Sequence, residues 1–218
     1  PGSIVLTAGE LLLPAEDING QTWTVQTIQP GGAKFFVTGS KKESNFHVVD
    51  SEYRGLAALD AVTAIVIAEG YATADTLSQA LSCPVVAAFD SGNLLKVAQV
   101  LQKKYPEKPI VIAGDDDLTQ ESINGKNPGK EKAMEAAQLV NGAVVLPIFA
   151  PGEQMSQQLS DFNDLANKSV LGIEAVKRQV GSVVEKVSQQ AKQDSLLRLQ
   201  APIEPKQQEI KQKRALIR

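Results

Sequence analysis

Four short apolar runs alternate with segments of helical periodicity between residues 64 and 148. The runs lie at 64–68, 85–89, 110–113 and 143–148, and the segments between them, at 72–81, 93–104 and 128–140, repeat apolar residues at helical spacing. Continuous apolar runs are typical of parallel strands buried on both faces, with the helices as crossovers. The sequence therefore predicts an α/β fold with a parallel sheet flanked by helices. Polar, glycine-containing residues 118–127 are expected to form an insertion loop.

The first 55 residues follow a different pattern. Strands are expected at 10–14, 22–28, 34–38 and 46–49, with turn sequences at 17–20 and 30–32. Alternating polar and apolar residues at 23–28 and the glycines of the turns favour an antiparallel meander. We expect a small antiparallel β subdomain at 1–55, with Trp23 in its core, followed by a second domain at 56–170.

Residues 171–218 form a basic extension that differs in composition from the acidic remainder of the chain, although the formal net charge of the whole is only -3. Valines at 176, 180, 183, 184 and 187 predict one face of an amphipathic helix. Pro202 and Pro205 are expected to interrupt it before an extended or weakly helical stretch at 206–218. The acidic body is expected to attract cations, and the extension to pack on the body or to contact nucleic acid or an acidic partner.

Composition excludes several classes of protein. No apolar run approaches the roughly 20 residues that a membrane helix needs, and no secretory signal pattern precedes the first strands. We therefore expect a soluble, cytoplasmic protein with no membrane partner. With one cysteine, Cys83, and one histidine, His47, the chain lacks the residues for an internal disulfide or a structural zinc site. Both side chains are expected to have packing roles.

Acidic residues follow three of the predicted parallel strands. Glu69 follows the first, Asp90 the second, and the run Asp115-Asp116-Asp117 the third. Because ligands of open parallel sheets bind at the carboxyl ends of the strands, these carboxylates are expected to converge there and to bind Mg²⁺ (or Mn²⁺). The alternative is that they are ordinary turn residues and helix caps. That alternative is as good for Asp90, whereas three adjacent like charges favour a cation.

These motifs together resemble a known family. Strand-Glu69-Gly70-Tyr71, the later Asp115-Asp116-Asp117, the helix start Asn127-Pro128-Gly129-Lys130 and the motif 161–165 (DFNDL) are similar to the Toprim domain of DnaG-type primases, topoisomerases and some nucleases. Upstream, 17–20 (DING), 32–36 (GAKFF) and 45–47 (NFH) resemble the small β subdomain that precedes the Toprim fold in bacterial primases. The similarity is greatest to the Toprim-containing primases of conjugative plasmids and integrative elements.

The resemblance implies metal-dependent nucleotidyl transfer that makes primers on single-stranded DNA from nucleoside triphosphates, in plasmid replication or conjugation. It assigns Glu69, Asp115 and Asp117 as metal ligands and catalytic residues, and Asp161 and Asp164 as supporting metal ligands. The chain departs from the primase motif at Thr73, where that motif has an aspartate, and it lacks the zinc-binding module of a complete primase. We therefore expect that the fragment alone can be inactive.

Cations and aromatic residues complete the candidate site. Lys34 matches a basic position of the primase β subdomain and is expected to bind the triphosphate or template phosphates and to act in catalysis. Lys130, at a helix start, is a second candidate for a phosphate contact, with a surface role as the alternative. Lys41 and Lys42 are either phosphate contacts or a solvated hairpin tip. Base stacking and core packing are both open for Tyr71 and Phe162.

Two other functions remain open on the sequence alone. The first is a metal-dependent Toprim nuclease, because the same acidic residues support hydrolysis. The second is a non-catalytic DNA-binding or interaction module of a larger plasmid protein, whose partners would include a helicase or another replication or transfer protein. A topoisomerase is disfavoured, because the sequence supplies no further domain with a nucleophilic tyrosine.

Overall fold

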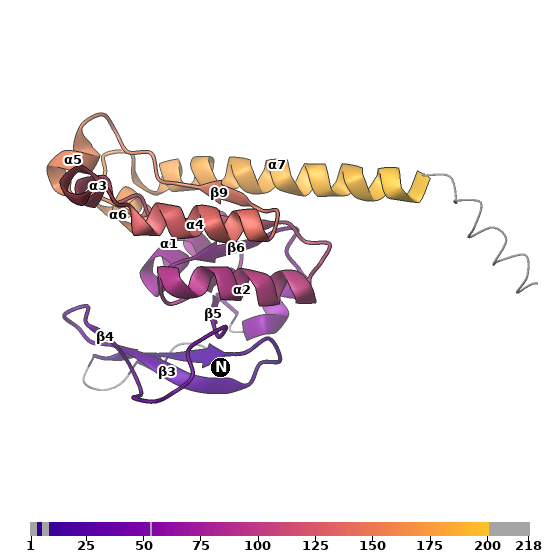
Figure 1. Cartoon of the computed structure of the whole chain (residues 1–218), viewed down its shortest axis with the longest axis horizontal. Coiled ribbons are helices and arrows are strands. Elements are labelled where there is room, and N and C mark those ends of the chain that lie inside the picture. Colours follow the sequence, from indigo (N-terminus) through magenta and orange to yellow (C-terminus); the bar gives the residue numbers. More distant parts are fainter. Residues whose placement is uncertain (1–3, 6–8, 53, 201–218) are drawn as a thin grey trace, which may run out of the picture.

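Two β-sheets organise the chain, as seen in the computed structural model, which describes residues 4–5, 9–52 and 54–200 (Figure 1). The first has four strands in the order β1-β2-β3-β4, and the second has five in the order β5-β7-β6-β8-β9. Helices cover both faces of the second sheet, while the first sheet lies at the opposite side of the molecule from the long helix α7 (Figure 1).

The first sheet is antiparallel, as the alternation of polar and apolar residues predicts. It consists of β1 (Ile4–Val5), β2 (Leu11–Glu16), β3 (Thr22–Ile28) and β4 (Lys34–Phe36). Thr27 pairs with Phe35 and Ile28 with Lys34, so Lys34 enters the sheet at its edge strand. Leu13 and Ala15 of β2 are fully buried against Phe89, which follows the second parallel strand. This small apolar cluster joins the first sheet to the second.

The fourth strand predicted for the meander belongs instead to the other sheet. Strand β5 (His47–Val49) pairs antiparallel with β7 (Val85–Ala87), and its three residues are all buried. The bridge between Glu16 and Phe46 still links the start of β5 to the end of β2. One continuous segment therefore connects the two sheets through backbone hydrogen bonds.

The central sheet confirms the predicted parallel strands. Strands β6 (Ile65–Ala68), β7, β8 (Ile110–Ala113) and β9 (Ala143–Val145) are parallel, with Ile67 opposite both Val86 and Ile112. Strand β9 ends at Val145, short of the predicted 148, and Pro147 has no N–H to donate to a continued ladder.

Helices sort onto the two faces of this sheet according to the alternation of its side chains. Ile65 and Ile67 face α2 (Ser91–Lys104), α4 (Pro128–Leu139) and the short 3-10 helix η1 (Gly55–Asp60), whereas Val66 and Ala68 face α1 (Tyr71–Leu81), α6 (Phe162–Asn167) and α7 (Gly172–Gln200). Because both faces are covered, the four parallel strands are apolar at every position, and the sequence alone therefore predicts them.

Residues 118–127 do not form the predicted loop. Residues Leu118–Asn124 form helix α3, which ends at Gly125 in the left-handed conformation (φ 71) and packs near α5 (Glu153–Gln157). No residue of α3 is buried, so the helix has no apolar stripe that periodicity could detect. Its ends are defined by polar contacts, which are part of the candidate site.

Helix α7 contains the predicted valine stripe. Val176 and Val180 are fully buried, and Val183, Val184 and Val187 pack at the margin of the same core. The residues of α7 after 191 are exposed. Pro202, Pro205 and the basic stretch 206–218 lie outside the described residues. Among the helices of the described ranges, none combines the length and the apolar character needed to cross a membrane.

Candidate active site

The first acidic residue of the site, Glu69, leaves strand β6 at its carboxyl end. Burial is the main cause that raises its pKa, and the charges of Asp90 and Asp117 raise it further. Lys34 of the antiparallel sheet lowers the pKa of Glu69, and its Nζ lies 3.5 Å from the point that a Cβ on Gly70 would occupy. The ammonium group of Lys34, from the first sheet, therefore lies at the acidic edge of the second sheet.

Among the acids of the site, Asp115 has the most strongly raised pKa. It follows β8, and its Oδ1 is buried with no hydrogen-bond partner among the described residues. Burial raises the pKa of Asp115 to about 8, and the charges of Glu69, Asp161 and Asp117 contribute, while Lys34 acts in the opposite direction. An unpartnered, desolvated carboxylate is costly unless a proton or a cation neutralises it.

Gly129 allows helix α4 to approach Asp115 closely. A Cβ built on Gly129 would lie 3.0 Å from the Cβ of Asp115 and 3.1 Å from its carbonyl oxygen. These separations are tighter than ordinary van der Waals contacts, so only glycine fits without displacement of the helix or of the acid.

Asp161 reaches the site from the other side, at the start of α6. Its Oδ1 accepts a hydrogen bond from the Asp164 backbone N–H at 2.7 Å, and its Oδ2 accepts one from the Thr73 hydroxyl at 3.0 Å. Burial raises the pKa of Asp161, and these two hydrogen bonds oppose the rise. The threonine that departs from the primase motif therefore contacts a predicted metal ligand.

Asp164 has partners of its own. Its Oδ2 accepts from the Ser160 N–H at 3.0 Å, and its Oδ1 forms an ion pair with Lys168 at 2.7 Å. With both oxygens engaged and its own N–H bound to Asp161, the residue holds the Asp161 turn together. Its predicted place as a supporting metal ligand stays a prediction.

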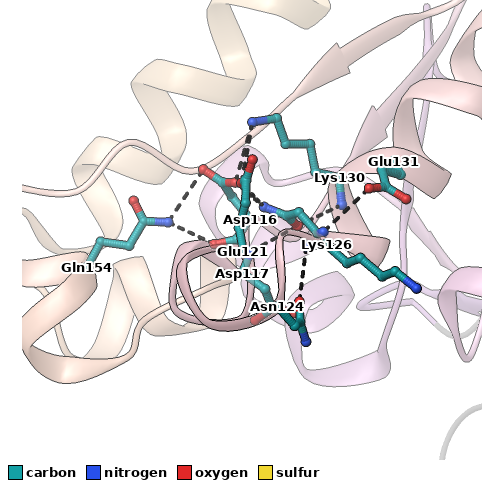
Figure 2. Close-up of polar contacts among 9 residues, drawn as sticks. Asp116, Asp117, Glu121, Asn124, Lys126, Lys130, Glu131 and Gln154 are labelled. Atoms are coloured by element: carbon teal, nitrogen blue, oxygen red, sulfur yellow. Dashed lines mark hydrogen bonds and ion pairs between the residues drawn. The ribbon is translucent and has the colours of Figure 1, made fainter.

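The three consecutive aspartates do not share one environment. The charge of Asp117 helps to raise the pKa of Asp115 and of Glu69, so these three acids lie close enough to interact. Asp116 instead faces a polar cluster at the start of α4, where its Oδ1 accepts from the Asn127 amide at 2.8 Å and its backbone carbonyl accepts from Gln154 at 2.8 Å (Figure 2). In the sequence, Asn127 is recognisable as the start of a helix within the Toprim-like motif 127–130, because an Asn-Pro pair there is typical of a cap, whereas nothing marks Gln154.

The other predicted cations lie around this acidic edge. Lys130 Nζ is 4.0 Å from Asp116 and 3.9 Å from Glu121, so it offsets part of the negative charge of the polar cluster (Figure 2). Lys42 pairs with Asp90, which also caps α2 by accepting the Asn93 N–H at 3.1 Å. In the structure Asp90 is therefore the N-cap of α2, as one of the two interpretations of this residue expected.

Among the aromatic residues, Trp23 does not have its predicted position in the core. Trp23 is 45% exposed and is not in the core, because its indole N–H bonds Asp17 at 3.0 Å and Lys41 lies over its ring at 5.0 Å. Phe162 is fully buried and Tyr71 packs at the margin of two apolar clusters. Placement of Phe162 in the core leaves no face for a base to stack on.

The remaining two singled-out residues have packing environments. His47 is 5% exposed, its Nδ1 lies 3.1 Å from the carbonyl oxygen of Pro14, and burial lowers its pKa. Burial likewise raises the pKa of the Cys83 thiol, which keeps it protonated.

The acidic side chains of the site lie near one another, and their charges interact. In the part of the chain that the structure describes, no group of three His, Cys, Asp or Glu side chains is close enough to hold a metal together. The buried, unpartnered oxygen of Asp115 nevertheless fits a cation. Mg²⁺ is commonly held by one or two carboxylates, with waters and substrate phosphates filling the other positions, and this site has that character.

Comparison with known proteins identifies the family. Residues 64–170 match the Toprim domain model. Two relatives from Escherichia coli, both named DNA primase TraC, are 39% and 40% identical over 83% and 93% of this chain, but the alignments cover 16% and 24% of the relatives. The chain therefore spans less than a quarter of the length of these relatives.

Solved structures agree on the fold. The primase fragment of the bacteriophage T7 primase-helicase protein superposes with a TM-score of 0.52 at 16% identity, over 80% of this chain and 62% of that one. The DnaG primase catalytic domain, solved with single-stranded DNA, gives a TM-score of 0.50 at 16% identity, over 82% and 55% of the two chains. Toprim domains generally bind metal ions, in agreement with the acidic edge described above. Residues 64–170 of the chain form a Toprim domain, and over most of its length the chain is similar in sequence to DNA primases.

Proposed function

We propose that this chain is the catalytic-core segment of a DNA primase, which joins nucleoside triphosphates into a primer on single-stranded DNA. One observation carries the proposal: a buried carboxylate oxygen of Asp115 has no hydrogen-bond partner among the described residues, at the acidic edge of a Toprim domain. The similarity to proteins named DNA primase favours nucleotidyl transfer over other Toprim reactions.

The proposed cofactor is Mg²⁺ (or Mn²⁺), with each ion bound by one or two of the carboxylates of Asp115, Glu69 and Asp117, with Asp161 beside them, and by waters and substrate phosphates. When bound, such ions neutralise the charge that develops on the transferred phosphate and on the attacking and leaving oxygens. The carboxylates would bring the ions to the edge of the sheet, and the raised pKa of Asp115 means that ion binding displaces a proton from this residue.

Lys34 is proposed to bind the triphosphate. It is exposed on β4, yet close enough to Gly70 to affect the pKa of both Glu69 and Asp115. A cation in this place can neutralise the phosphates of an incoming nucleotide next to the metal-binding acids. Lys130, already opposite Asp116 and Glu121, is a weaker candidate because its charge is compensated by these acids.

The partners follow from the same reaction. A single-stranded DNA template and nucleoside triphosphates would occupy the acidic edge, and a helicase or another replication or transfer protein is proposed as a further partner. The exposed face of Trp23 with Lys41 above it offers a stacking surface of the kind that binds unpaired bases.

Primer synthesis by the purified chain tests the proposal. The chain is incubated with single-stranded DNA, labelled nucleoside triphosphates and Mg²⁺ or Mn²⁺, and the products are separated by length. We expect short new oligomers that are absent with Glu69→Gln and retained with Glu107→Gln, whose side chain is exposed far from the acidic edge.

Two results would contradict the proposed function. Shortening of the template that depends on Glu69 would assign a nuclease instead. A chain that neither makes oligomers nor cuts DNA, with or without added segments of a longer relative, would leave a binding module as the function.

A further inference from the structure

Asn127 is the most fully engaged polar side chain beside the acidic site. It is 3% exposed and immediately precedes α4. Its Nδ2 donates to Asp116 Oδ1 at 2.8 Å and to Glu121 Oε2 at 3.0 Å, while its Oδ1 accepts from the backbone N–H groups of Asp117 at 3.2 Å and Lys130 at 3.3 Å. Two hydrogen bonds donated and two accepted are the full capacity of a primary amide.

These contacts divide the aspartate run between two directions. The side chain of Asp116 is held on the side of Glu121, Lys130 and Gln154, as Figure 2 shows, and the Asp116 N–H donates to the Ser160 carbonyl at 2.7 Å. The next residue, Asp117, is fixed through its backbone by the same amide that binds the Asp116 carboxylate. Its neighbour on the other side, Asp115, is the acid with the unpartnered buried oxygen.

We propose that Asn127 is a positioning residue that sets the rotation of the run 115–117, so that Asp116 is held in the polar cluster while Asp115 and Asp117 are presented to the metal-binding edge. The inference rests on the proposed function in its use of the metal, and it adds a residue to which neither the family match nor the relatives assign a role. It also accounts for the neutral amide at this place, because a carboxylate cannot donate to Asp116 and Glu121.

A purely structural role for Asn127 makes a different prediction. As the cap of α4, the side chain needs only an acceptor oxygen, and aspartate caps a helix as well as asparagine does. Asn127→Asp therefore keeps the cap and removes both donors. If capping were its whole role, this variant would fold and bind metal like the parent chain.

The first experiment measures Mn²⁺ affinity of the 218-residue chain by calorimetry or electron paramagnetic resonance at pH 8. We expect Asn127→Asp to bind Mn²⁺ roughly 10- to 100-fold more weakly, the range typical for groups that orient metal ligands. The matched control is Asn124→Asp, the same chemical change on an exposed residue of α3, which is expected to leave the affinity within about twofold of the parent.

An exchange of the two partners separates hydrogen bonding from added charge. The double variant Asp116→Asn with Asn127→Asp restores one donor and one acceptor between these positions and has the same net charge as the parent. We expect it to recover most of the Mn²⁺ affinity that Asn127→Asp loses. An Asn127→Asp variant that binds as tightly as the parent, or an exchanged pair that recovers nothing, would overturn the proposal.

A second measurement needs no metal. In Asn127→Ala, hydrogen exchange of the Asp117 amide, followed by nuclear magnetic resonance, is expected to become at least about tenfold faster, while the amide of Val111 in β8 keeps its rate. Unchanged exchange at Asp117 would overturn the inference. If the parent chain binds no Mn²⁺, the proposed function fails on that result, and the exchange rates still decide whether Asn127 positions the run.

Discussion

The Thr73 hydroxyl donates a 3.0 Å hydrogen bond to Oδ2 of Asp161, across 88 positions of sequence. Thr73 is 3% exposed in the first turn of α1, and Asp161 caps α6. The primase motif has an aspartate where this chain has Thr73, and a second carboxylate at this distance would repel Asp161. The threonine instead supplies a neutral donor that favours the ionised form of Asp161.

Thr73→Val tests this contact. Valine fills nearly the same space but leaves Asp161 without its donor, so the pKa of Asp161 is expected to rise further and Mn²⁺ binding to weaken. Loss of a hydrogen bond to a buried acceptor also costs about 1–3 kcal/mol of unfolding free energy. Thr76→Val is the matched control, because Thr76 on the same helix donates to a neutral partner, Asn163, at 3.0 Å. The control should lose stability without loss of metal affinity; equal affinity losses would contradict the assignment.

The stability of the metal-free chain should depend on pH through Asp115. Its pKa is about 8 in the folded chain against 3.8 for an ordinary aspartate, so the folded state retains a proton that the unfolded state releases. Stability from this residue is therefore complete below about pH 4 and decreases as the pH rises toward 8. Asp115→Asn removes the titration, so the melting temperature of this variant minus that of the parent should grow between pH 5 and 9. A constant difference would show that Asp115 ionises normally.

Divalent ions should stabilise the fold through the same carboxylates. The melting temperature of the parent is expected to increase with Mn²⁺ concentration, more at pH 8 than at pH 6, because the ion competes with the proton on Asp115. The double variant Asp115→Asn with Asp117→Asn should lose this response while it folds as stably as the metal-free parent or more so. Glu107→Gln with Glu135→Gln, two exposed acids, is the control. A full Mn²⁺ response in the first double variant would refute the metal site.

Gly129→Ala should disturb the site through distance alone. The added methyl group would stand 3.0 Å from the Asp115 Cβ, so either α4 or the acid must move by a few tenths of an ångström. We expect weaker Mn²⁺ binding and a loss of about 1–3 kcal/mol in unfolding free energy. Gly181→Ala in α7, whose Cβ would lie at an ordinary 3.7 Å from Leu81, should instead stabilise the chain by about 0.5–1 kcal/mol. Unchanged metal affinity in Gly129→Ala would show that α4 can shift without displacing Asp115 from the metal site, which would contradict the prediction.

The sequence predicts the parallel sheet well because strands that are buried on both faces consist of uninterrupted apolar residues. Val66 and Ile67 point to opposite faces, and each meets a helix, so the run contains no polar position. The edge at which the acids converge then follows from strand direction alone. Strand direction by itself therefore predicts that Glu69 and Asp115 lie at the same edge of the sheet.

Other elements have no local pattern of apolar residues that predicts their place in the fold. Strand β5 was recognisable as a strand, but pairing of Val48 with Val86 joins distant segments, and a local pattern does not specify the partner. Helix α3 buries none of its residues, so only its polar ends define it. The different surroundings of Asp115 and Asp116 involve the hydrogen bond from Asn127 to Asp116, and the exposed position of Trp23 involves its contacts with Asp17 and Lys41. These are contacts between side chains whose geometry periodicity does not encode.

Attachment of β5 to the central sheet has a mechanical consequence. Glu16 at the end of β2 is bridged to Phe46, and β5, which follows directly, is paired with β7. The ring of Phe36 in the first sheet packs edge-on against that of Phe89, which follows β7, with ring centroids 5.2 Å apart. A hinge between the sheets would have to break backbone bonds and an aromatic contact together. Lys34 and the carboxylates beside it are therefore held at a fixed separation, and we expect this site to be preformed, so that a phosphate chain can bind without closure of one sheet on the other.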